Sequence, residues 1–434
     1  MTVDRKAYRA AIVHSVADPA HVPVEASYEY FEDGLMVVEN GTITALGHAH
    51  DLLPGLTADT QLVTYTDALI TAGFIDTHIH LPQTGIIGAY GEQLLDWLGT
   101  YVFPCEQQFA DPMHSAKVAD IFLKELLRNG TTTALVFGSR HKESVEALFS
   151  AAETLNLRLI AGKVMMDRNA PDYLVDTAQS SYTDSKVLIE RWHGKGRLHY
   201  AVTPRFAPTS TPEQLTLAGQ LLTEYPDLYM QTHISENLKE MEWVKALFPE
   251  HEHYLDVYDH FQLLGERSVF AHGVHLCDQE CARLSETGSA VAFCPTSNLF
   301  LGSGLFDLAM TERHKVNVGL GTDVGAGTSF SILHTLNEAY KVMQLQGARL
   351  SPFKSLYLAT LGGAHALRLE DKIGNLLPGT EADFVVLDFN ATPLLSYRMQ
   401  QTTNIEEQLF VLMTLGDDRT VRETYSAGVL VHKR

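Results

Sequence analysis

The hydrophobic pattern changes character twice along the chain. Residues 10–69 carry short alternating apolar and polar runs broken by turns, and residues 34–47 have the pattern of a hairpin around Asn40-Gly41. Strand-like runs return at 382–388 and 423–431. Between these ends, apolar strand runs alternate with segments whose apolar residues recur every three or four positions. We therefore expect two β-rich ends flanking a long α/β middle.

The middle contains eight strand candidates, with helical patterns between most of them. Helical spacing is evident at 113–128, 145–155 and 212–225, and segments 329–346 and 351–367 complete this region. Strands joined by crossover helices pair in parallel, and eight of them suit a closed (β/α)8 barrel of the TIM type. An open doubly wound sheet is the alternative, but no glycine-rich nucleotide motif follows the first strand. The strand candidates are residues 74–80, 132–137, 158–164, 198–203, 228–233, 268–272, 290–294 and 316–322.

This pattern predicts how the chain is divided into domains. Residues 1–70 and 376–434 are expected to form one small β-sandwich domain built from both termini. Residues 71–375 then form the catalytic barrel, inserted between the two halves of the smaller domain. The fold class is α/β.

Composition narrows the range of partners. The 434 residues carry a formal charge of −21, which argues against a surface that attracts nucleic-acid phosphates. The four cysteines lack paired CxxC spacing, which favours a reducing compartment. No apolar run reaches membrane-spanning length, and no apolar signal region follows residues 1–6. We expect a cytoplasmic protein with neither a nucleic-acid nor a membrane partner.

Candidate metal ligands end several of the predicted strands. His78 and His80 lie two apart at the end of the first barrel strand, so their side chains point the same way. His233, His272 and Asp323 end later apolar runs, and strand ends meet on one face of a barrel. Three imidazoles and a carboxylate suit zinc or another divalent first-row metal, with an open position for a water whose pKa falls to about 7. Ordinary strand histidines, and a turn aspartate at position 323, are the alternatives.

Two further residues near these ligands are catalytic candidates. Glu236 comes three residues after His233, where a carboxylate could act as general acid and base. The alternative is a glutamate in the first turn of a helix. His272 is either a ligand or a group that orients bound water or substrate, and Asp323 could face both the metal and that water. His275 is the local rival of His272 but lies past the strand end.

Two segments have the chemistry to contact a flat polar substrate. Gln83, which follows the histidine pair, can both donate to and accept from a planar heterocycle. Arg205 and Phe206 combine a rigid donor fork with an aromatic plane. Ordinary loop packing remains the alternative for all three.

Longer strings of residues resemble a known family. Phe74-Ile75-Asp76-Thr77-His78-Ile79-His80 is similar to the first-strand motif of the amidohydrolase superfamily, and the β-rich termini resemble its accessory domain. Residues 81–83, 88–95, 129–135, 163–171, 203–209 and 293–299 resemble the guanine deaminase branch. The similarity runs from about residue 31 to residues 415–418. The histidine pair specifies only the superfamily, whereas the combination with segments 81–83, 203–209 and 233–236 is specific to the branch.

The resemblance implies a function and a role for each site residue. The expected reaction is the hydrolytic deamination of guanine to xanthine and ammonia, in a protein that forms a homodimer. By resemblance, Glu236 is the proton shuttle and His272 hydrogen-bonds the metal-bound water. Strand four ends without the lysine that bridges two metals in other members, which implies one zinc ion per chain. The implied zinc ligands are His78, His80, His233 and Asp323, and the implied guanine contacts are Gln83, Arg205 and Phe206.

Other functions stay open on the sequence alone. A related deaminase could act on an oxidised purine, cytosine or a triazine, and a ring-opening amidase is disfavoured by the missing lysine. A non-catalytic scaffold would be expected to lack one of the ligands, and none is replaced here. The unrelated cytidine deaminase architecture is excluded because its combination of H-x-E with P-C-x-x-C is absent: no P-C-x-x-C occurs in the chain.

Overall fold

A computed structural model describes residues 5–90 and 94–434. The first residues used to argue against a signal, and residues 91–93 of the segment that resembles guanine deaminases, lie outside this description. The chain forms two compact units. The first comprises residues 5–75, 124–133 and 331–434, and the second comprises the described residues of 76–123 together with 134–330. These units group residues by packing, so the domain boundaries drawn from the sequence stay a prediction.

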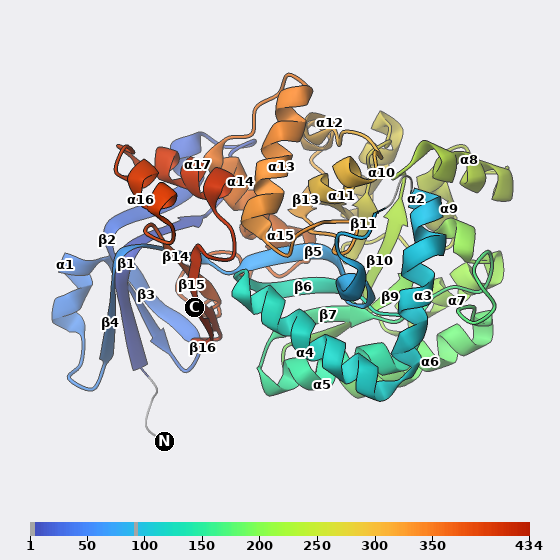
Figure 1. The fold of residues 1–434 in the computed structure, drawn as a ribbon, viewed down its shortest axis with the longest axis horizontal. Helices are drawn as coiled ribbons and strands as arrows, with labels where there is room; N and C mark the ends of the chain where they lie inside the picture. The colour runs from blue at the N-terminus through green and yellow to red at the C-terminus, as the bar shows by residue number, and fades with distance from the viewer. Residues whose placement is uncertain (1–4, 91–93) are drawn as a thin grey trace. The chain divides into compact units, whose positions relative to one another are not determined.

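The first unit contains a mixed sheet built from both ends of the chain, as expected. Its seven strands run in the order β16-β15-β14-β4-β1-β2-β3, and the blue and dark red ribbons of the two ends lie side by side in Figure 1. β1 and β4 pair in parallel, whereas the other neighbouring strands described in this sheet pair antiparallel. The strands are β1 (Arg5–Ser15), β2 (Tyr28–Glu39), β3 (Thr42–His48), β4 (Gln61–Ala72), β14 (Phe384–Asp388), β15 (Val421–Ser426) and β16 (Val429–Lys433).

Turn chemistry and aromatic packing define this sheet. The predicted hairpin is confirmed: β2 and β3 pair in antiparallel register, and Asn40 and Gly41 both have positive φ angles, of 50° and 83°. On the buried face, the rings of Phe384 and Tyr425 stack with centroids 4.3 Å apart. The unit's helices are α1 (Ala49–Leu52), α13 (Ile332–Leu345), α14 (Pro352–Ala359), α15 (Leu361–Ala366), α16 (Pro393–Met399) and α17 (Ile405–Leu415).

The predicted eight-stranded barrel is also confirmed. The strand order is β13-β12-β11-β10-β9-β7-β6-β5, and a short strand β8 pairs with β9. β5 and β6 are buried along their whole length, as expected of parallel strands covered on both faces. The strands are β5 (Phe74–His80), β6 (Thr131–Phe137), β7 (Arg158–Gly162), β8 (Val164–Met165), β9 (Leu198–Pro204), β10 (Tyr229–Ile234), β11 (Ser268–His272), β12 (Ala290–Phe293) and β13 (Asn317–Leu320).

The first and last barrel strands approach each other and nearly close the sheet. The Thr77 hydroxyl donates to the Leu320 carbonyl over 3.1 Å. Beyond it, the amide of Thr322 donates to Asp76 and the amide of Asp323 donates to the His78 carbonyl. β13 ends at Leu320, two residues before the predicted end at 322, so Asp323 lies in a loop held by these bonds.

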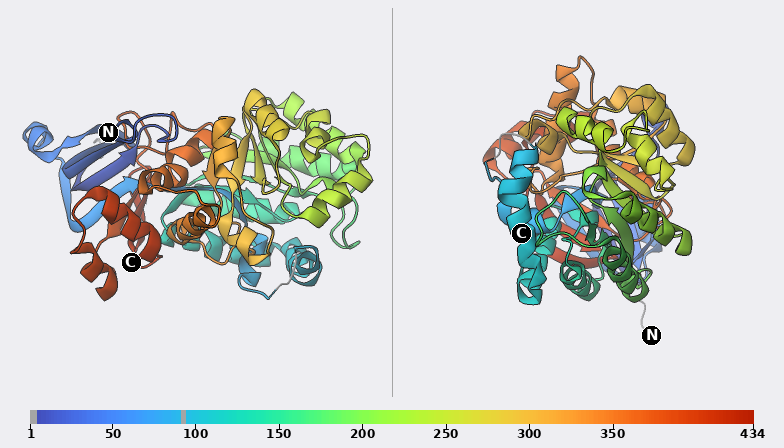
Figure 2. Two further views of the ribbon diagram at one scale, coloured as in Figure 1. Left: turned by 90° about the horizontal axis from the view of Figure 1, so that it is seen from above. Right: turned by 90° about the vertical axis from the view of Figure 1, so that its right-hand side faces the viewer.

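Helices lie on the outer side of the strands in the second unit, in cyan to gold in Figure 2 (right). The start of α7 illustrates how the local sequence determines where a helix begins. The Thr211 hydroxyl accepts from the Gln214 amide, and Pro212 occupies the first turn. The helices are α2 (Leu94–Trp97), α3 (Phe103–Gln107), α5 (Lys142–Thr154), α6 (Ala178–Trp192), α7 (Pro212–Glu224), α8 (Leu238–Leu247), α9 (Tyr254–His260), α10 (Asp278–Thr287), α11 (Pro295–Phe300) and α12 (Leu308–Arg313). Helix α4 (Pro112–Arg128) continues from the second unit into the first.

Two further sequence expectations can be compared with the fold. Within residues 5–90 and 94–434, no helix is long and apolar enough to cross a membrane. The four cysteines are free thiols, three of them buried.

Candidate active site

His78 and His80 end strand β5 with both side chains buried. Their Nε2 atoms are 3.2 Å apart, as the two-residue spacing on a strand predicts. The ring of Phe137, at the end of β6, packs against both imidazoles with centroid distances of 4.9 and 4.6 Å. An aromatic wall therefore holds the pair in place and excludes water from one side.

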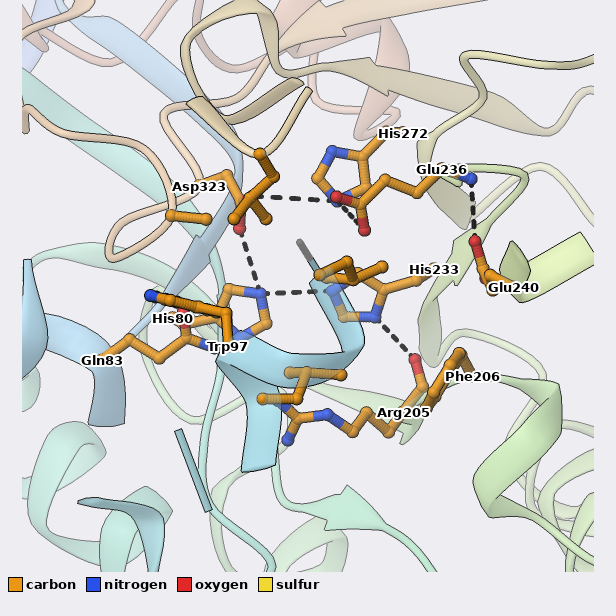
Figure 3. A pocket seen from close by; sticks show the side chains of 14 residues that line it. His80, Gln83, Trp97, Arg205, Phe206, His233, Glu236, Glu240, His272 and Asp323 are labelled. Atoms are coloured by element: carbon orange, nitrogen blue, oxygen red, sulfur yellow. Dashed lines mark hydrogen bonds and ion pairs between the residues drawn. The ribbon is translucent and has the colours of Figure 1, made fainter. Parts of the chain in front are cut away.

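Three imidazole nitrogens and one carboxylate oxygen gather at one point, around His80 Nε2. His233 Nε2 lies 3.3 Å from His80 Nε2, and Asp323 Oδ1 lies 3.2 Å from the Nε2 atoms of both His78 and His80. Ligands at about 2.0–2.1 Å in a tetrahedral zinc site are themselves about 3.3–3.4 Å apart. The separations observed here fit such a metal. Figure 3 shows His80 and His233, from two strands, and Asp323, from the loop after β13, facing one another.

The imidazoles present lone pairs rather than protons to this point. His233 Nδ1 donates to the Arg205 carbonyl over 2.6 Å, which leaves Nε2 free of a proton. Burial lowers the pKa of His80 to about 3 against the opposing effect of Asp323. Burial and the neighbouring imidazoles hold the pKa of His233 well below its usual value. All three features suit metal ligation, which requires neutral imidazole.

Asp323 stays ionised although it is buried. Burial raises the pKa of its carboxyl, but the imidazoles of His272 and His78 outweigh this and hold the pKa well below its usual value. The preceding Gly321 allows this close approach, because a Cβ there would lie 2.7 Å from Cys294 Sγ and 2.9 Å from His78 Cβ. Asp323 therefore presents a negative charge to the neighbouring imidazoles.

Glu236 and His272 face each other beside the ligand cluster. His272 Nε2 lies 3.3 Å from Glu236 Oε2 and 3.7 Å from Asp323 Oδ2, and its Nδ1 bonds to Asn298. Burial raises the pKa of Glu236 to about 7, while the Ser303 hydroxyl donates to its other oxygen. A carboxyl with a pKa near neutrality can both accept and deliver a proton. His275, the rival of His272, instead bonds to the Ser303 carbonyl, 2.9 Å away.

The loop that carries Glu236 is fixed by hydrogen bonds to the side chain of Glu240. Helix α8 begins at Leu238 with Asn237 as its cap, so Glu236 precedes the helix instead of forming its first turn. The carboxylate of Glu240 accepts from the backbone amides of Glu236 and Asn237 over 3.0 and 3.1 Å. The Tyr254 hydroxyl donates to the other oxygen of Glu240. These bonds fix the backbone position from which the Glu236 side chain extends.

The predicted substrate residues lie in the same pocket as the ligand cluster. Gln83 is buried in a short helical turn, and its side-chain oxygen accepts from the Gly325 amide over 3.2 Å. Arg205 directly follows β9, and its guanidinium donates to Glu106. The Phe206 ring is buried beside them. The structure thus brings the residues assigned to the site from the sequence together at one pocket, although neither His78 nor the rival His275 is among the residues that line it.

The pocket has a cavity volume of about 30 Å³. Its apolar surface comes from α2 and from residues following α11 and β13. Within the part of the chain that the structure describes, the buried indole N–H of Trp97 has no hydrogen-bond partner. The lining residues are His80, Gln83, Leu94, Trp97, Leu98, Arg205, Phe206, His233, Glu236, Glu240, His272, Leu301, Asp323 and Ala326.

Sequence reasoning missed three residues of this site. Glu240 was detectable, because Asn237 and Glu240 have the spacing of a helix capping box. Glu106 is the one charged residue of the short helix α3, and a lone charge in an apolar stretch could have marked it as a candidate. Trp97 carries no signal beyond its hydrophobicity. Elsewhere, Lys163 is bonded to Asp176 over 2.7 Å in a buried ion pair.

One other group of potential ligands lies outside the pocket. His253, Cys277 and Glu280 have ligand atoms within 4.8 Å of one another. Both oxygens of Glu280 already accept backbone amides, from Leu255 and Cys277, at the starts of α9 and α10. This arrangement is accounted for by helix capping.

Comparisons with known proteins agree with this geometry. Residues 69–431 match the amidohydrolase family. The chain is 55% identical over 411 residues to the guanine deaminase of Escherichia coli, with 95% of this chain and 94% of that protein covered. It is 41% identical to a probable guanine deaminase of Deinococcus radiodurans, with 99% of both chains covered.

Solved structures give the same result. A guanine deaminase from C. acetobutylicum with bound guanine in the active site superimposes with a TM-score of 0.89 at 27% identity, covering 99% of this chain and 100% of that one. The chain belongs to the amidohydrolase family, and within that family it groups with the guanine deaminases.

Proposed function

We propose that this protein hydrolyses guanine to xanthine and ammonia with one zinc ion per chain. The observation that carries the proposal is a single buried pocket that combines a metal-ligating cluster with a proton-carrying glutamate, an arginine and a glutamine. The guanine deaminases to which the chain is similar support the choice of substrate. Deaminases of this family are metal-dependent, and three imidazoles with one carboxylate favour zinc.

His78, His80, His233 and Asp323 would hold the metal. The separations of 3.2–3.3 Å among their facing atoms support this assignment. When bound, the ion supplies Lewis-acid activation of a water molecule at neutral pH. The remaining chemistry belongs to residues of the chain.

Glu236 carries the protons. It accepts a proton from the attacking water and delivers it to the ring nitrogen beside the amino-bearing carbon. The proton of the hydroxyl now on that carbon then passes to the amino group; the C–N bond breaks, ammonia leaves, and the hydroxyl oxygen becomes the second carbonyl of xanthine. The Glu236 pKa of about 7 suits both directions of transfer. His272 lies between Glu236 and Asp323 and orients the attacking water.

Arg205, Gln83 and Phe206 select the purine. The Arg205 guanidinium donates to the carbonyl of guanine, and Phe206 offers an apolar surface to the ring. The bond from Gly325 to the Gln83 oxygen orients that amide, so its nitrogen is available as a donor. Adenine has an amino group where guanine has its carbonyl, so it would leave the arginine donor unpaired.

Some wider properties are also proposals. We expect a cytoplasmic homodimer that binds neither nucleic acid nor membranes, in line with the charge of −21. The domain organisation we propose is a composite β domain of residues 1–70 and 376–434, with residues 71–375 as the catalytic barrel. Light scattering of the purified protein measures the oligomeric state directly.

A substrate panel tests the proposed reaction. Ammonia release is measured from guanine, adenine, an oxidised guanine, cytosine and an aminotriazine, together with the metal content of the protein. We expect guanine to be the best substrate and adenine to react up to about 10⁴–10⁵-fold less efficiently, because a buried donor is left unpaired. Faster turnover of another compound would overturn the choice of substrate. Absence of both turnover and stoichiometric metal would instead indicate a non-catalytic scaffold.

A further inference from the structure

A buried glutamate outside the metal cluster binds the proposed recognition arginine. Both carboxylate oxygens of Glu106 accept from Arg205 Nη1, over 2.8 and 2.9 Å. The Glu106 side chain is 0% exposed and that of Arg205 is 3% exposed. A buried ion pair of this kind costs desolvation energy on both partners, so it is weak evidence for a stabilising role. Because its arginine lines the pocket, the pair suggests a functional role instead.

The short helix α3 presents two groups to the guanidinium. Phe103 and Glu106 are three residues apart and so lie on one face of the helix. The Arg205 guanidinium carbon lies 5.6 Å from the centre of the Phe103 ring. One helix face therefore supplies both an aromatic plane and a carboxylate to the same arginine.

Helix α3 is itself fixed to the rest of the site. The Cys105 thiol donates to the Pro82 carbonyl over 3.1 Å, next to Gln83. The Ser139 hydroxyl donates to the Glu106 carbonyl over 3.2 Å, just past the end of β6. These contacts tie the carboxylate to the segment that carries the other proposed purine contact.

We propose that Glu106 is the positioning residue of the purine end of the pocket. It directs the Arg205 guanidinium, and it balances the arginine charge so that this end of the pocket is neutral overall. This inference rests on the proposed contact between Arg205 and guanine. Glu106 acts through Arg205 and is not a pocket-lining residue.

Charge balance matters because substrate and product differ in acidity. Guanine is neutral at neutral pH, whereas xanthine carries two carbonyls around a ring N–H and loses a proton more readily. An unbalanced arginine would attract the xanthine anion and retain the product. Glu106 lets the arginine bind a neutral purine without strengthening the hold on an anionic one.

Glu106→Gln tests this inference because it keeps the shape and removes the charge. We expect kcat/KM for guanine to fall about 10- to 100-fold, the effect of losing charge-assisted hydrogen bonds. Inhibition by xanthine should become tighter, while inhibition by neutral hypoxanthine should become weaker. A general structural defect would weaken all three ligands together. An unchanged inhibition constant for xanthine overturns the inference.

Asp176→Asn is the matched control. Asp176 pairs with Lys163 over 2.7 Å, and the two side chains are 1% and 0% exposed, but this pair lies outside the pocket lining. Its loss should lower the melting temperature without opposite shifts for xanthine and hypoxanthine. If Asp176→Asn reproduces the opposite shifts, they do not report on Arg205 and the inference fails.

Glu106→Asp separates position from charge and covers the case in which the glutamine variant does not fold. The shorter side chain keeps the charge but cannot reach the guanidinium in the same geometry. We expect a lower kcat/KM for guanine with xanthine inhibition close to that of the unaltered protein. Xanthine inhibition as tight as we expect in Glu106→Gln would contradict the charge-balancing role.

A double-mutant cycle distinguishes this inference from the proposed function. If Glu106 acts through Arg205, adding Glu106→Gln to Arg205→Ala should lower kcat/KM little further. Full additivity of the two losses overturns the positioning role while leaving the arginine contact intact. If Arg205→Ala alone keeps normal kcat/KM for guanine, the proposed recognition by Arg205 is what fails.

Discussion

The metal end and the purine end of the pocket are built in different ways. The histidines that we propose as metal ligands lie on barrel strands, at the ends of β5 and β10, with Asp323 in the short loop after β13. At the purine end, Gln83 and Trp97 lie in short helical segments, and Arg205 follows β9. Strand ends place the first set, whereas contacts between loops place the second.

This difference assigns the reaction to the metal end of the pocket and the choice of ligand to the purine end. Parallel register pairs Ile234 with His272, so His233 and His272 lie one residue out of register at the same end of the barrel. The purine end depends on single contacts such as that between Glu106 and Arg205. We infer that changes at the metal end abolish the reaction, while changes at the purine end alter which ligands bind.

The largest expected effect is at the metal end. His80→Asn removes an imidazole whose Nε2 lies within 3.3 Å of three other ligand atoms. We expect no detectable deamination and a metal content well below one per chain, measured by elemental analysis. The partly exposed His314, which pairs with Asp278, is the control position. If His80→Asn retains both metal and activity, the proposed ligand set is wrong.

The next effect should appear in turnover without loss of metal. Glu236→Gln keeps the shape but cannot carry a proton, so kcat should fall by about 10²–10⁴-fold with unchanged metal content. Near-normal turnover would remove Glu236 from the role of proton shuttle.

The pH profile of kcat/KM gives a second readout of Glu236. Its carboxyl has a pKa raised to about 7 by burial. Since the carboxylate must accept a proton from water, kcat/KM should fall as pH drops below about 7. A bound cation favours the carboxylate and moves this limb to lower pH. The limb should be absent from Glu236→Gln.

Arg205→Ala should affect the purine end alone. We expect kcat/KM for guanine to fall about 10- to 100-fold and the preference over adenine to shrink, with metal content unchanged. Arg140, which pairs with Asp176 outside the pocket lining, provides the control variant. An Arg205→Ala enzyme that still prefers guanine over adenine to the same degree would place specificity elsewhere.

The same contrast explains what the sequence could predict. The barrel, the terminal sheet and the positions of His78, His233 and Asp323 follow from periodicity, because strand ends in a barrel must meet on one face. Small differences arose where strands end: the predicted strand 158–164 is broken at Lys163 into β7 and β8. Local patterns were sufficient for these features.

The purine end was less predictable because its contacts join distant segments. Glu106 and Arg205 are 99 residues apart in sequence, and no local period links α3 to the end of β9. Side-chain chemistry singled out Gln83 and Arg205 as substrate contacts, and the family resemblance assigned them to guanine, whereas neither identified their supporting residues. Tertiary contacts of this kind require the folded structure.

The smallest effect we expect concerns Trp97, the pocket residue whose indole N–H lacks a partner among the described residues. Trp97→Phe keeps an aromatic ring and removes only this donor. If a purine acceptor satisfies the N–H, KM for guanine should rise roughly 2- to 10-fold with kcat little changed, since a net hydrogen bond contributes about 0.5–1.5 kcal/mol. Trp243→Phe is the matched control, because that ring packs against Phe206 without lining the pocket. An equal rise in KM in both variants would mean that aromatic packing, and not the Trp97 donor, sets affinity at the purine end.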